Sequence, residues 1–249
     1  MQQHPVPNTS ATPAGPARPL SSDTMTAWTQ TRYGDPSALE RAEASIPSIG
    51  PDDVLIRVAA TSINAADRYL ADPALLLRPM VGRLGGPKDP VGGLDVAGTI
   101  VAVGDAVDRF AIGDQVFGDI GGGFGPIAAG AAEFLALVPA SMSLVEAGGV
   151  PVAGLTALQG LRDHGRLSAG ERVLVNGASG GVGSFAVQVA AALGAEVTAV
   201  CSTKTVASAL ELGATDVVDY TTTDVIEHFV DHGMTFDVVF DVAGVHSTK

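Results

Sequence analysis

The stretch RVLVNGASGGVGSFAVQVAAALGAEVTAVCSTK, residues 172–204, decides the fold around which the rest of the chain is arranged. It begins with a short apolar run at 173–175, as expected for a strand that is buried on both faces. A glycine-rich turn follows directly, and residues 184–193 are then rich in Ala and Leu at helical spacing. Gly194 stands where a helix C-terminal cap is expected, and a second apolar run covers 197–201. The pattern predicts a β-α-β unit.

The turn of this unit has the form A-x-G-x-x-G. It comprises Ala178, Ser179, Gly180, Gly181, Val182 and Gly183. Ala178 takes the first glycine position of the usual motif, Gly180 the second and Gly183 the third. Gly180 lets the backbone approach a pyrophosphate, and Gly183 lets the helix pack close to the strand. The free N–H groups at the start of the helix attract the phosphate charge. Three glycines alone are also consistent with ordinary turn chemistry, but the flanking strands and helix stand at the proper distances, so the unit predicts dinucleotide binding.

The end of the second strand indicates which dinucleotide is bound. An NAD site has an acidic residue about 20 residues after the first glycine, where it accepts from the ribose 2′-hydroxyl. This chain has Ser202 and Lys204 there, and Glu196 lies at the opposite end of the strand. A hydroxyl and a cation suit a 2′-phosphate, which a carboxylate would repel. We therefore predict NADP(H), with NADPH as the reductant; the alternative is that Ser202 caps the next helix and Lys204 is merely solvated.

The composition is that of a globular, acidic protein. The 249 residues are 46% apolar with a mean hydropathy of +0.31, enough for one large or two modest packed domains. The net charge of −13 opposes nucleic acid and anionic membranes as partners, and no uninterrupted apolar run has the length of a membrane span. The single cysteine, Cys201, excludes an internal disulfide and fits a reducing, cytoplasmic location.

The part of the chain before this unit indicates a small β-rich domain. Residues 1–24 are rich in Pro, Ser and Thr with little to bury, so we expect a disordered extension. Alternating strand character then begins, and we assign 25–145 to the β-rich domain. Within it, 54–61 reads as a strand, 62–69 continues into a short helix, and 72–91 reads as a loop. Further short strands, separated by turns, are expected at 93–98, 99–103, 110–118 and 132–138.

A helical stretch at 154–158 leads into the dinucleotide-binding domain, which we assign to 146–249. After Lys204 the expected elements are a helix to Leu212, a strand at 217–220, a helix at 224–232 and a strand at 236–242. This alternation predicts a parallel sheet with right-handed crossovers. It supplies four strands where such a sheet usually has six, so we expect the chain to be truncated at its C-terminus.

Several short motifs follow one another in a specific order. They are Ser62 to Asp67, Leu94 to Gly98, Arg109 to Gly118, Gly154 to Ala157 and Asn176 to Gly183. From Met25 to Lys249 the chain thereby resembles the medium-chain dehydrogenase/reductase superfamily, and within it the zinc-free quinone oxidoreductases. The resemblance implies an α/β protein: a GroES-like β-rich catalytic domain followed by a Rossmann doubly wound parallel sheet, with NADPH and substrate in the cleft between them.

The resemblance also implies roles for individual residues. It places Asn64 and Tyr69 beside the nicotinamide and the substrate carbonyl, Thr156 against the cofactor, Ser202 and Lys204 at the 2′-phosphate, and Tyr220 near the adenosine end. Each has a structural alternative: Asn64 as a turn former, the two tyrosines as packed aromatics, and Thr156 as a helix hydroxyl bonded to the preceding turn.

The residues argue against a metal. Zinc-dependent relatives have a Cys near the position of Asn64 and a His-Glu pair where Leu94-Asp95 stands, and a catalytic zinc needs about three such ligands. His228 and His232 would share a helix face, but no third ligand is apparent, so we interpret them as solvated. Asp67 and Asp95 are expected to be structural, bonded to nearby backbone or Arg. Cys201 is expected to be a small core residue.

The predicted function is that of a zinc-independent, NADPH-dependent oxidoreductase that transfers hydride to a quinone or an α,β-unsaturated carbonyl (an enone). The proton donor is left open between water and Tyr69. A second interpretation is an NADPH-binding sensor or scaffold, or an inactive fragment, without turnover. A homodimer is expected if the full-length chain is longer.

Overall fold

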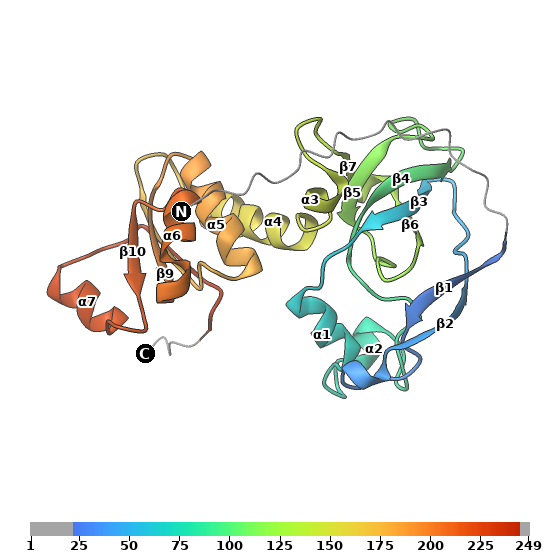
Figure 1. Ribbon diagram of the computed structural model, residues 1–249, viewed down its shortest axis with the longest axis horizontal. Coiled ribbons are helices and arrows are strands. Elements are labelled where there is room, and N and C mark those ends of the chain that lie inside the picture. Colours follow the sequence, from blue (N-terminus) through green and yellow to red (C-terminus); the bar gives the residue numbers. More distant parts are fainter. Residues whose placement is uncertain (1–21, 245–249) are drawn as a thin grey trace, which may run out of the picture. The chain divides into compact units, whose positions relative to one another are not determined.

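The computed structural model describes residues 22–244 (Figure 1). They form two compact units, which divide between Pro151 and Val152. The predicted disordered extension falls almost wholly on residues 1–21, outside the described residues, and Thr24 already belongs to the first strand. Within 22–244, no helix has both the length and the hydropathy that crossing a bilayer requires.

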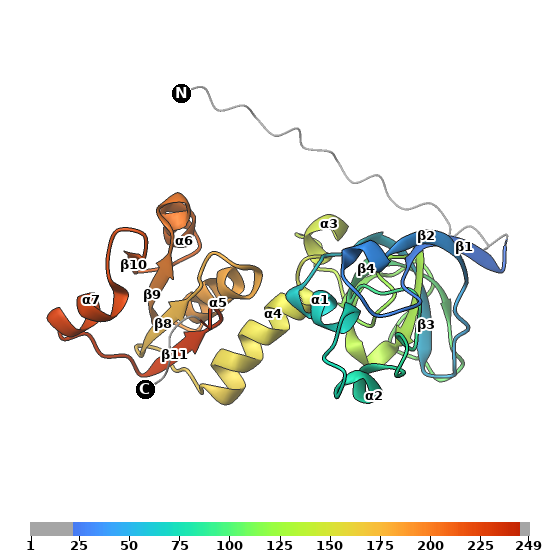
Figure 2. The ribbon, with the colours of Figure 1, turned by 90° about the horizontal axis from the view of Figure 1, so that it is seen from below.

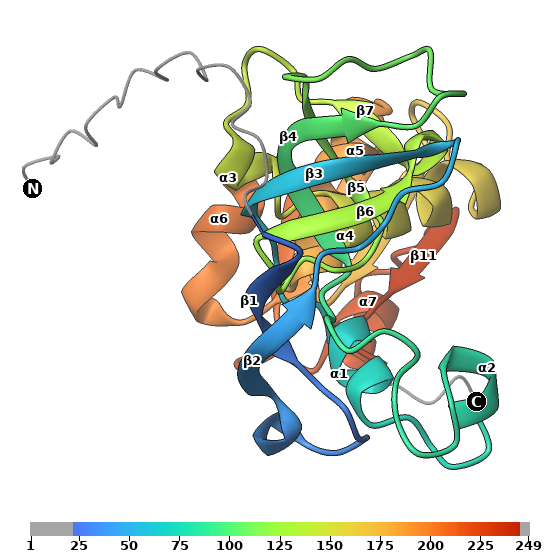
Figure 3. The same ribbon diagram turned by 90° about the vertical axis from the view of Figure 1, so that its right-hand side faces the viewer.

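The first unit is built on a five-stranded antiparallel sheet with the order β6-β3-β4-β5-β7 (Figure 3). Its strands are β3 (Asp53–Ala60), β4 (Asp95–Val103), β5 (Gln115–Asp119), β6 (Ile127–Ala131) and β7 (Leu135–Leu137). Alternate residues of the central strands, among them Ile56 and Ile100, are fully buried in one core. Burial of these β-branched side chains is the main driving force for this unit.

A separate hairpin, β1 (Thr24–Thr29) and β2 (Glu40–Ser45), packs Met25 and Ala27 against Leu55 and Ile127 of the sheet. The helices of the unit are short. They are α1 (Ala65–Ala71), α2 (Arg78–Val81) and α3 (Leu144–Ala147), with 3-10 turns at Pro36–Ala38 and Ala132–Phe134.

The sequence-based prediction was wrong in detail for this unit. The expected strands at 93–98 and 99–103 are one continuous strand, because Gly98 is not a turn residue; a Cβ there would lie 2.1 Å from the carbonyl oxygen of Arg57 on β3. The segment 132–138 is a 3-10 turn followed by the three-residue β7, while β6 was not predicted. The expected loop at 72–91 contains α2.

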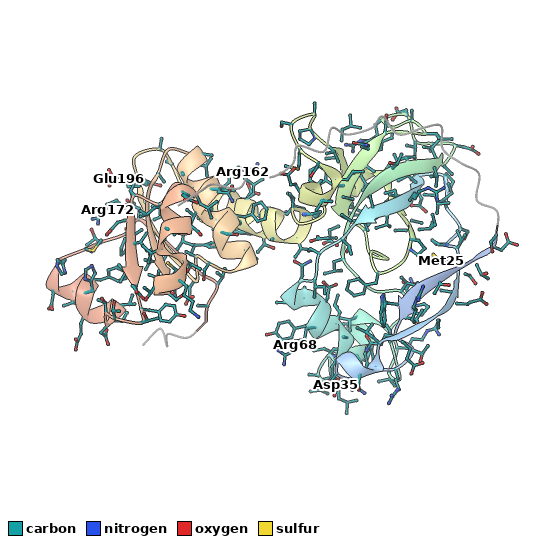
Figure 4. All side chains as sticks on the ribbon, viewed as in Figure 1. Met25, Asp35, Arg68, Arg162, Arg172 and Glu196 are labelled. Carbon is teal, nitrogen blue, oxygen red and sulfur yellow. The ribbon has the colours of Figure 1, made fainter. Side chains whose placement is uncertain are left out.

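The second unit has the predicted parallel sheet, with the order β10-β9-β8-β11 (Figure 2). Its strands are β8 (Arg172–Asn176), β9 (Glu196–Cys201), β10 (Asp216–Asp219) and β11 (Val238–Asp241). Figure 4 labels Arg172 and Glu196, which form the first register pair of β8 and β9. All four strands point the same way, so their carboxyl ends lie at one edge of the sheet.

Helices cover both faces of this sheet. They are α4 (Pro151–Leu158), which continues into a π-helix at Gln159–His164, α5 (Gly181–Ala192), α6 (Val206–Glu211) and α7 (Val225–Asp231). Val197, Ala199 and Cys201 share one core with α5 and the π-helix, whereas Val200 on the other face packs with Phe229 of α7. The unit is therefore a doubly wound α/β layer structure, as predicted.

Candidate functional site

The glycine-rich turn joins the end of β8 to the start of α5. A Cβ at Gly183 would lie 2.1 Å from the Gly177 carbonyl oxygen, so only glycine lets the first turn of α5 approach the strand this closely. A Cβ at Gly180 would lie 3.5 Å from the same oxygen, which is an ordinary contact. The protein itself therefore requires the glycine at 183 but leaves the space beside Gly180 open for a ligand.

The first turn of α5 faces that space. The first intrahelical N–H donors of any α-helix lack partners in the helix, and here they belong to Gly181, Val182 and Gly183. No side chain caps this end: the N-cap residue is Gly180, and it makes no side-chain hydrogen bond. Since α5 is twelve residues long, its dipole adds to the attraction of these donors for an anion. The turn thus fits the pyrophosphate of a dinucleotide.

A small pocket adjoins this turn and extends to α6. It has a volume of about 180 Å³ and is lined by Ala178, Ser179, Ser184, Thr205, Ser208, Ala209 and Leu212. Four of these residues carry hydroxyl groups, and none carries a charge. The lining therefore suits a polar group that accepts hydrogen bonds, such as a ribose or phosphate oxygen.

The segment after β9 provides the cation. Lys204 is exposed and forms no ion pair within the described part of the chain. The described cations of the second unit are Arg162, Arg166, Arg172 and Lys204, and Lys204 is the one that follows the carboxyl end of a strand. Ser202 stands at the start of the 3-10 turn Thr203–Thr205 but makes no side-chain capping bond to it. The alternative assignment of Ser202 as a cap thus has no hydrogen bond to support it.

A carboxylate of the neighbouring strand end lies beside this segment. Asp219, the last residue of β10, accepts hydrogen bonds from the Thr203 hydroxyl and, at 2.6 Å, from the Thr221 hydroxyl. The Thr203 bond, followed by the bonds from Thr221, lowers the pKa of the Asp219 carboxyl. Tyr220 comes next and its side chain is 57% exposed. The adjacent ends of β9 and β10 are therefore followed by a cation and closed by a carboxylate with a lowered pKa, respectively.

In the first unit, Asn64 precedes α1 and is tied to the start of β4. Its backbone N–H donates to Asp67 Oδ2 at 2.7 Å, and its side-chain Nδ2 donates to Asp95 Oδ2 at 3.0 Å and Ser62 Oγ at 3.1 Å. The Ser62 hydroxyl also donates to Asp95 Oδ2. Asp95 is fully buried. Asn64 is thus the N-cap residue of α1, and hydrogen bonds to Ser62 and Asp95 hold its side chain.

The other predicted site residues are distributed between the two units. Tyr69 on α1 is 75% exposed, so neither it nor Tyr220 is the packed aromatic of the alternative interpretation. The Thr156 hydroxyl donates to the Val152 carbonyl oxygen at 2.6 Å, which is the backward bond that the alternative described. This bond uses its only hydrogen and leaves oxygen lone pairs available to a ligand.

The described residues do not assemble a metal site. No group of three or more His, Cys, Asp or Glu within 22–244 is placed to hold an ion. His228 and His232 do share a face of α7, with ring centroids 4.3 Å apart. Where a zinc relative would have ligands, this chain has the amide of Asn64 and one carboxylate, Asp95, so the donor set does not fit zinc. Cys201 is 1% exposed within the core, as predicted.

Sequence reasoning missed two features of these sites. The Asp95 carboxylate accepts from the side chains of Ser62 and Asn64, two partners that the expectation of backbone or Arg contacts did not include. The Thr203–Asp219 contact joins two strand ends separated by 16 positions in the sequence. Neither contact has a local sequence signature; the polar Ser62, two residues before Asn64, was the only available signal.

The fold is that of a GroES-like β unit followed by a Rossmann-like α/β unit. Comparison with known families agrees: an alcohol dehydrogenase GroES-like domain matches residues 50–147, and a zinc-binding dehydrogenase domain matches residues 181–249. The chain belongs to the medium-chain dehydrogenase/reductase superfamily, whose members are nicotinamide-dependent oxidoreductases.

Individual relatives cover most of the chain. It is 35% identical over 231 residues to a zinc-type alcohol dehydrogenase-like protein of Schizosaccharomyces pombe, covering 88% of this chain and 65% of that protein. It is 32% identical over 234 residues to the chloroplastic NADPH-dependent alkenal/one oxidoreductase of Arabidopsis thaliana, covering 89% and 58%. The solved quinone oxidoreductase of Coxiella burnetii superposes with a TM-score of 0.76 at 26% identity, covering 89% and 69%. The chain spans 57% to 66% of the length of the curated relatives it matches.

Proposed function

We propose that this chain is an NADPH-dependent oxidoreductase that reduces a quinone or an α,β-unsaturated carbonyl without a metal. The observation that carries the proposal is the open glycine turn at the start of α5, with Lys204 and no carboxylate at the end of the adjacent strand β9. The names of the relatives agree with it: one of them is an NADPH-dependent alkenal/one oxidoreductase and another a quinone oxidoreductase.

The residues of the second unit would hold the cofactor as follows. The N–H groups of Gly181, Val182 and Gly183 bind the pyrophosphate, and Ser202 and Lys204 bind the 2′-phosphate. NADPH supplies the hydride. The negative charge of Asp219 opposes a phosphate on the neighbouring strand end, so the preference for NADPH over NADH depends on the positive charge of Lys204. Tyr220, which is exposed, would lie near the adenosine, and the Thr156 oxygen would accept a hydrogen bond from the cofactor.

The residues of the first unit would bind the substrate. An amide N–H of Asn64 would donate to the carbonyl oxygen and stabilise the charge that develops there. The Tyr69 hydroxyl would be a second donor. Conjugation makes the quinone or enone reducible without a Lewis acid, consistent with the absence of three suitable ligands among residues 22–244. The protein contributes orientation and excludes water.

The proposed location is the cytoplasm, since the single cysteine requires no oxidising compartment. The proposed assembly is a homodimer. Light scattering on the purified protein measures the assembly directly, and a monomer at micromolar concentration would contradict it.

The first experiment is an absorbance assay of NADPH and NADH oxidation with 9,10-phenanthrenequinone, a short-chain enone and, in reverse, a simple alcohol. We expect NADPH to be consumed with the quinone or the enone, and the rate to be unchanged after treatment with a chelator. Tight NADPH binding without consumption would contradict turnover and leave a binding protein. Loss of activity with the chelator would contradict the metal-free mechanism.

The second experiment tests the cofactor preference. Lys204→Ala should raise the KM for NADPH about tenfold, as expected for the loss of one charge-assisted contact, and leave that for NADH unchanged. Arg162→Ala is the matched control, because Arg162 is another exposed cation of the same unit and is paired with Asp163. Equal effects of the two substitutions, or a wild-type preference for NADH, would contradict the assignment of Ser202 and Lys204.

A further inference from the structure

A buried carboxylate organises the residues before α1. Asp95, at the start of β4, is fully buried and accepts hydrogen bonds at its Oδ2 from the Ser62 hydroxyl and from Asn64 Nδ2. Asn64 Nδ2 also lies 3.0 Å from that oxygen and 3.1 Å from Ser62 Oγ, so the three polar atoms form a triangle. Asp95 therefore contacts the amide both directly and through Ser62.

This triangle fixes which way the amide faces. The Ser62 hydroxyl gives its hydrogen to the carboxylate, so its lone pairs face Asn64 and can only accept. A reversed amide would direct the Asn64 Oδ1 at two acceptors. The nitrogen therefore points toward Asp95, and the amide orientation follows from the chemistry of its neighbours.

The triangle also determines what Asn64 can still offer. Because Ser62 Oγ and Asp95 Oδ2 are bonded to each other, they lie in nearly the same direction from Asn64 Nδ2. The two hydrogens of an amide nitrogen diverge by about 120°, so one hydrogen is shared between these oxygens and the second points elsewhere. The oxygen of the Asn64 side chain faces the Asp67 backbone N–H in a capping box, and within residues 22–244 its Nδ2 makes no hydrogen bond other than those to Ser62 and Asp95.

We propose that Ser62 and Asp95 are positioning residues for Asn64, which hold its amide so that one N–H faces a carbonyl oxygen of the bound ligand. The proposal rests on the proposed function, in which Asn64 touches the ligand. The carbonyl oxygen can belong to the substrate or to the carboxamide of the nicotinamide ring. Both present the same acceptor to the amide N–H.

The chain offers a matched control for the Ser62 hydroxyl. Thr61, the preceding residue, donates its hydroxyl at 2.6 Å to the backbone oxygen of the same Asp95 and has no hydrogen bond with the amide of Asn64. Thr61→Val removes this bond with little change in shape. Ser62→Ala removes the bond in the triangle, and Ser62→Thr keeps a hydroxyl at that position.

Steady-state kinetics test the proposal. Ser62→Ala should lower kcat/KM about tenfold, because a small displacement of a ligand-binding group has a large effect on rate. Ser62→Thr should restore most of the loss, and Thr61→Val should remain close to the wild type. Equal losses in Ser62→Ala and Thr61→Val would overturn the proposal. A rise in the NADPH Kd without substrate identifies the cofactor carboxamide as the partner; a change confined to kcat and the substrate KM identifies the substrate carbonyl.

A second measurement does not depend on activity. The chain has three asparagines, Asn8, Asn64 and Asn176, so labelling with 15N-asparagine gives three pairs of side-chain amide signals in NMR, and Asn64→Asp assigns one pair. One Asn64 amide hydrogen should exchange slowly in the wild type and in Thr61→Val, and faster in Ser62→Ala. Unchanged exchange in Ser62→Ala would overturn the positioning role. An inactive wild-type protein with this exchange pattern would instead contradict the proposed function alone.

Discussion

Asp119, the last residue of β5, pairs in register with the buried Asp95 of β4. Although Asp119 keeps contact with solvent, partial burial raises the pKa of its carboxyl, and the charges of Asp95 and Asp67 raise it further. A carboxyl whose pKa is higher in the folded than in the unfolded state favours folding while it is protonated, and this contribution is lost as the pH rises through the folded-state pKa.

We therefore expect Asp119→Asn to be more stable than the wild type at neutral pH, and the difference to disappear in mildly acidic solution. Urea unfolding of both proteins over a pH series measures this. Glu43→Gln, at an exposed carboxylate on β2, controls for the loss of one negative charge from a protein of net charge −13. A difference in the free energy of unfolding that stays constant at all pH values would show that the titration of Asp119 does not cause it.

At the scale of elements, the turn between β8 and α5 separates two uses of glycine. Gly183→Ala forces a Cβ against the Gly177 carbonyl oxygen, so backbone must move, and we expect a loss of about 1–3 kcal/mol of stability. Gly180→Ala fits the protein but occupies the space beside the turn, so the melting temperature should hold while the Kd for NADPH rises.

Thermal unfolding and a cofactor titration of the two variants distinguish these effects. Both substitutions add the same methyl group, so each is the control for the other. Equal losses of stability would contradict the difference in space at the two glycines, and an unchanged Kd in Gly180→Ala would show that the cofactor does not use the open space.

The elements of the second unit were predictable because each has its own local signal. β8, α5 and β9 follow from apolar runs, helical spacing and Gly194, whose φ of 82° confirms it as the helix-ending glycine. The first unit was less predictable, since its short strands depend on pairing between distant residues. Gly98 shows why: glycine there permits close approach of β3, and the sequence alone does not distinguish this from a turn.

At the scale of the whole molecule, each unit has cores of its own. Val54, Ile56 and their neighbours form a core in the first unit, and Val173, Val197 and theirs form another in the second. Compact units with separate cores can unfold in separate steps. The site residues are likewise divided, with Asn64 and Tyr69 in one unit and the glycine turn and Lys204 in the other.

We expect calorimetry to show two unfolding transitions. NADPH should raise mainly the midpoint temperature of the transition of the second unit. Ligand at 100 times its Kd stabilises the unit that binds it by about 2.7 kcal/mol. Gly183→Ala should lower the midpoint temperature of the second unit's transition, and this shift identifies which transition belongs to that unit. A single transition, or an equal shift of both by NADPH, would contradict independent unfolding of the units.

Cys201 ends β9, one residue before Ser202, and is the single thiol of the chain. Because its side chain is only 1% exposed, Cys201 can react with a disulfide dye only after local unfolding. The rate of that reaction therefore measures how often the end of β9 unfolds. A cofactor bound at the adjacent segment should slow that reaction. The protein thus carries a natural probe, in need of no engineered label, that reports occupancy of the cofactor site without any turnover.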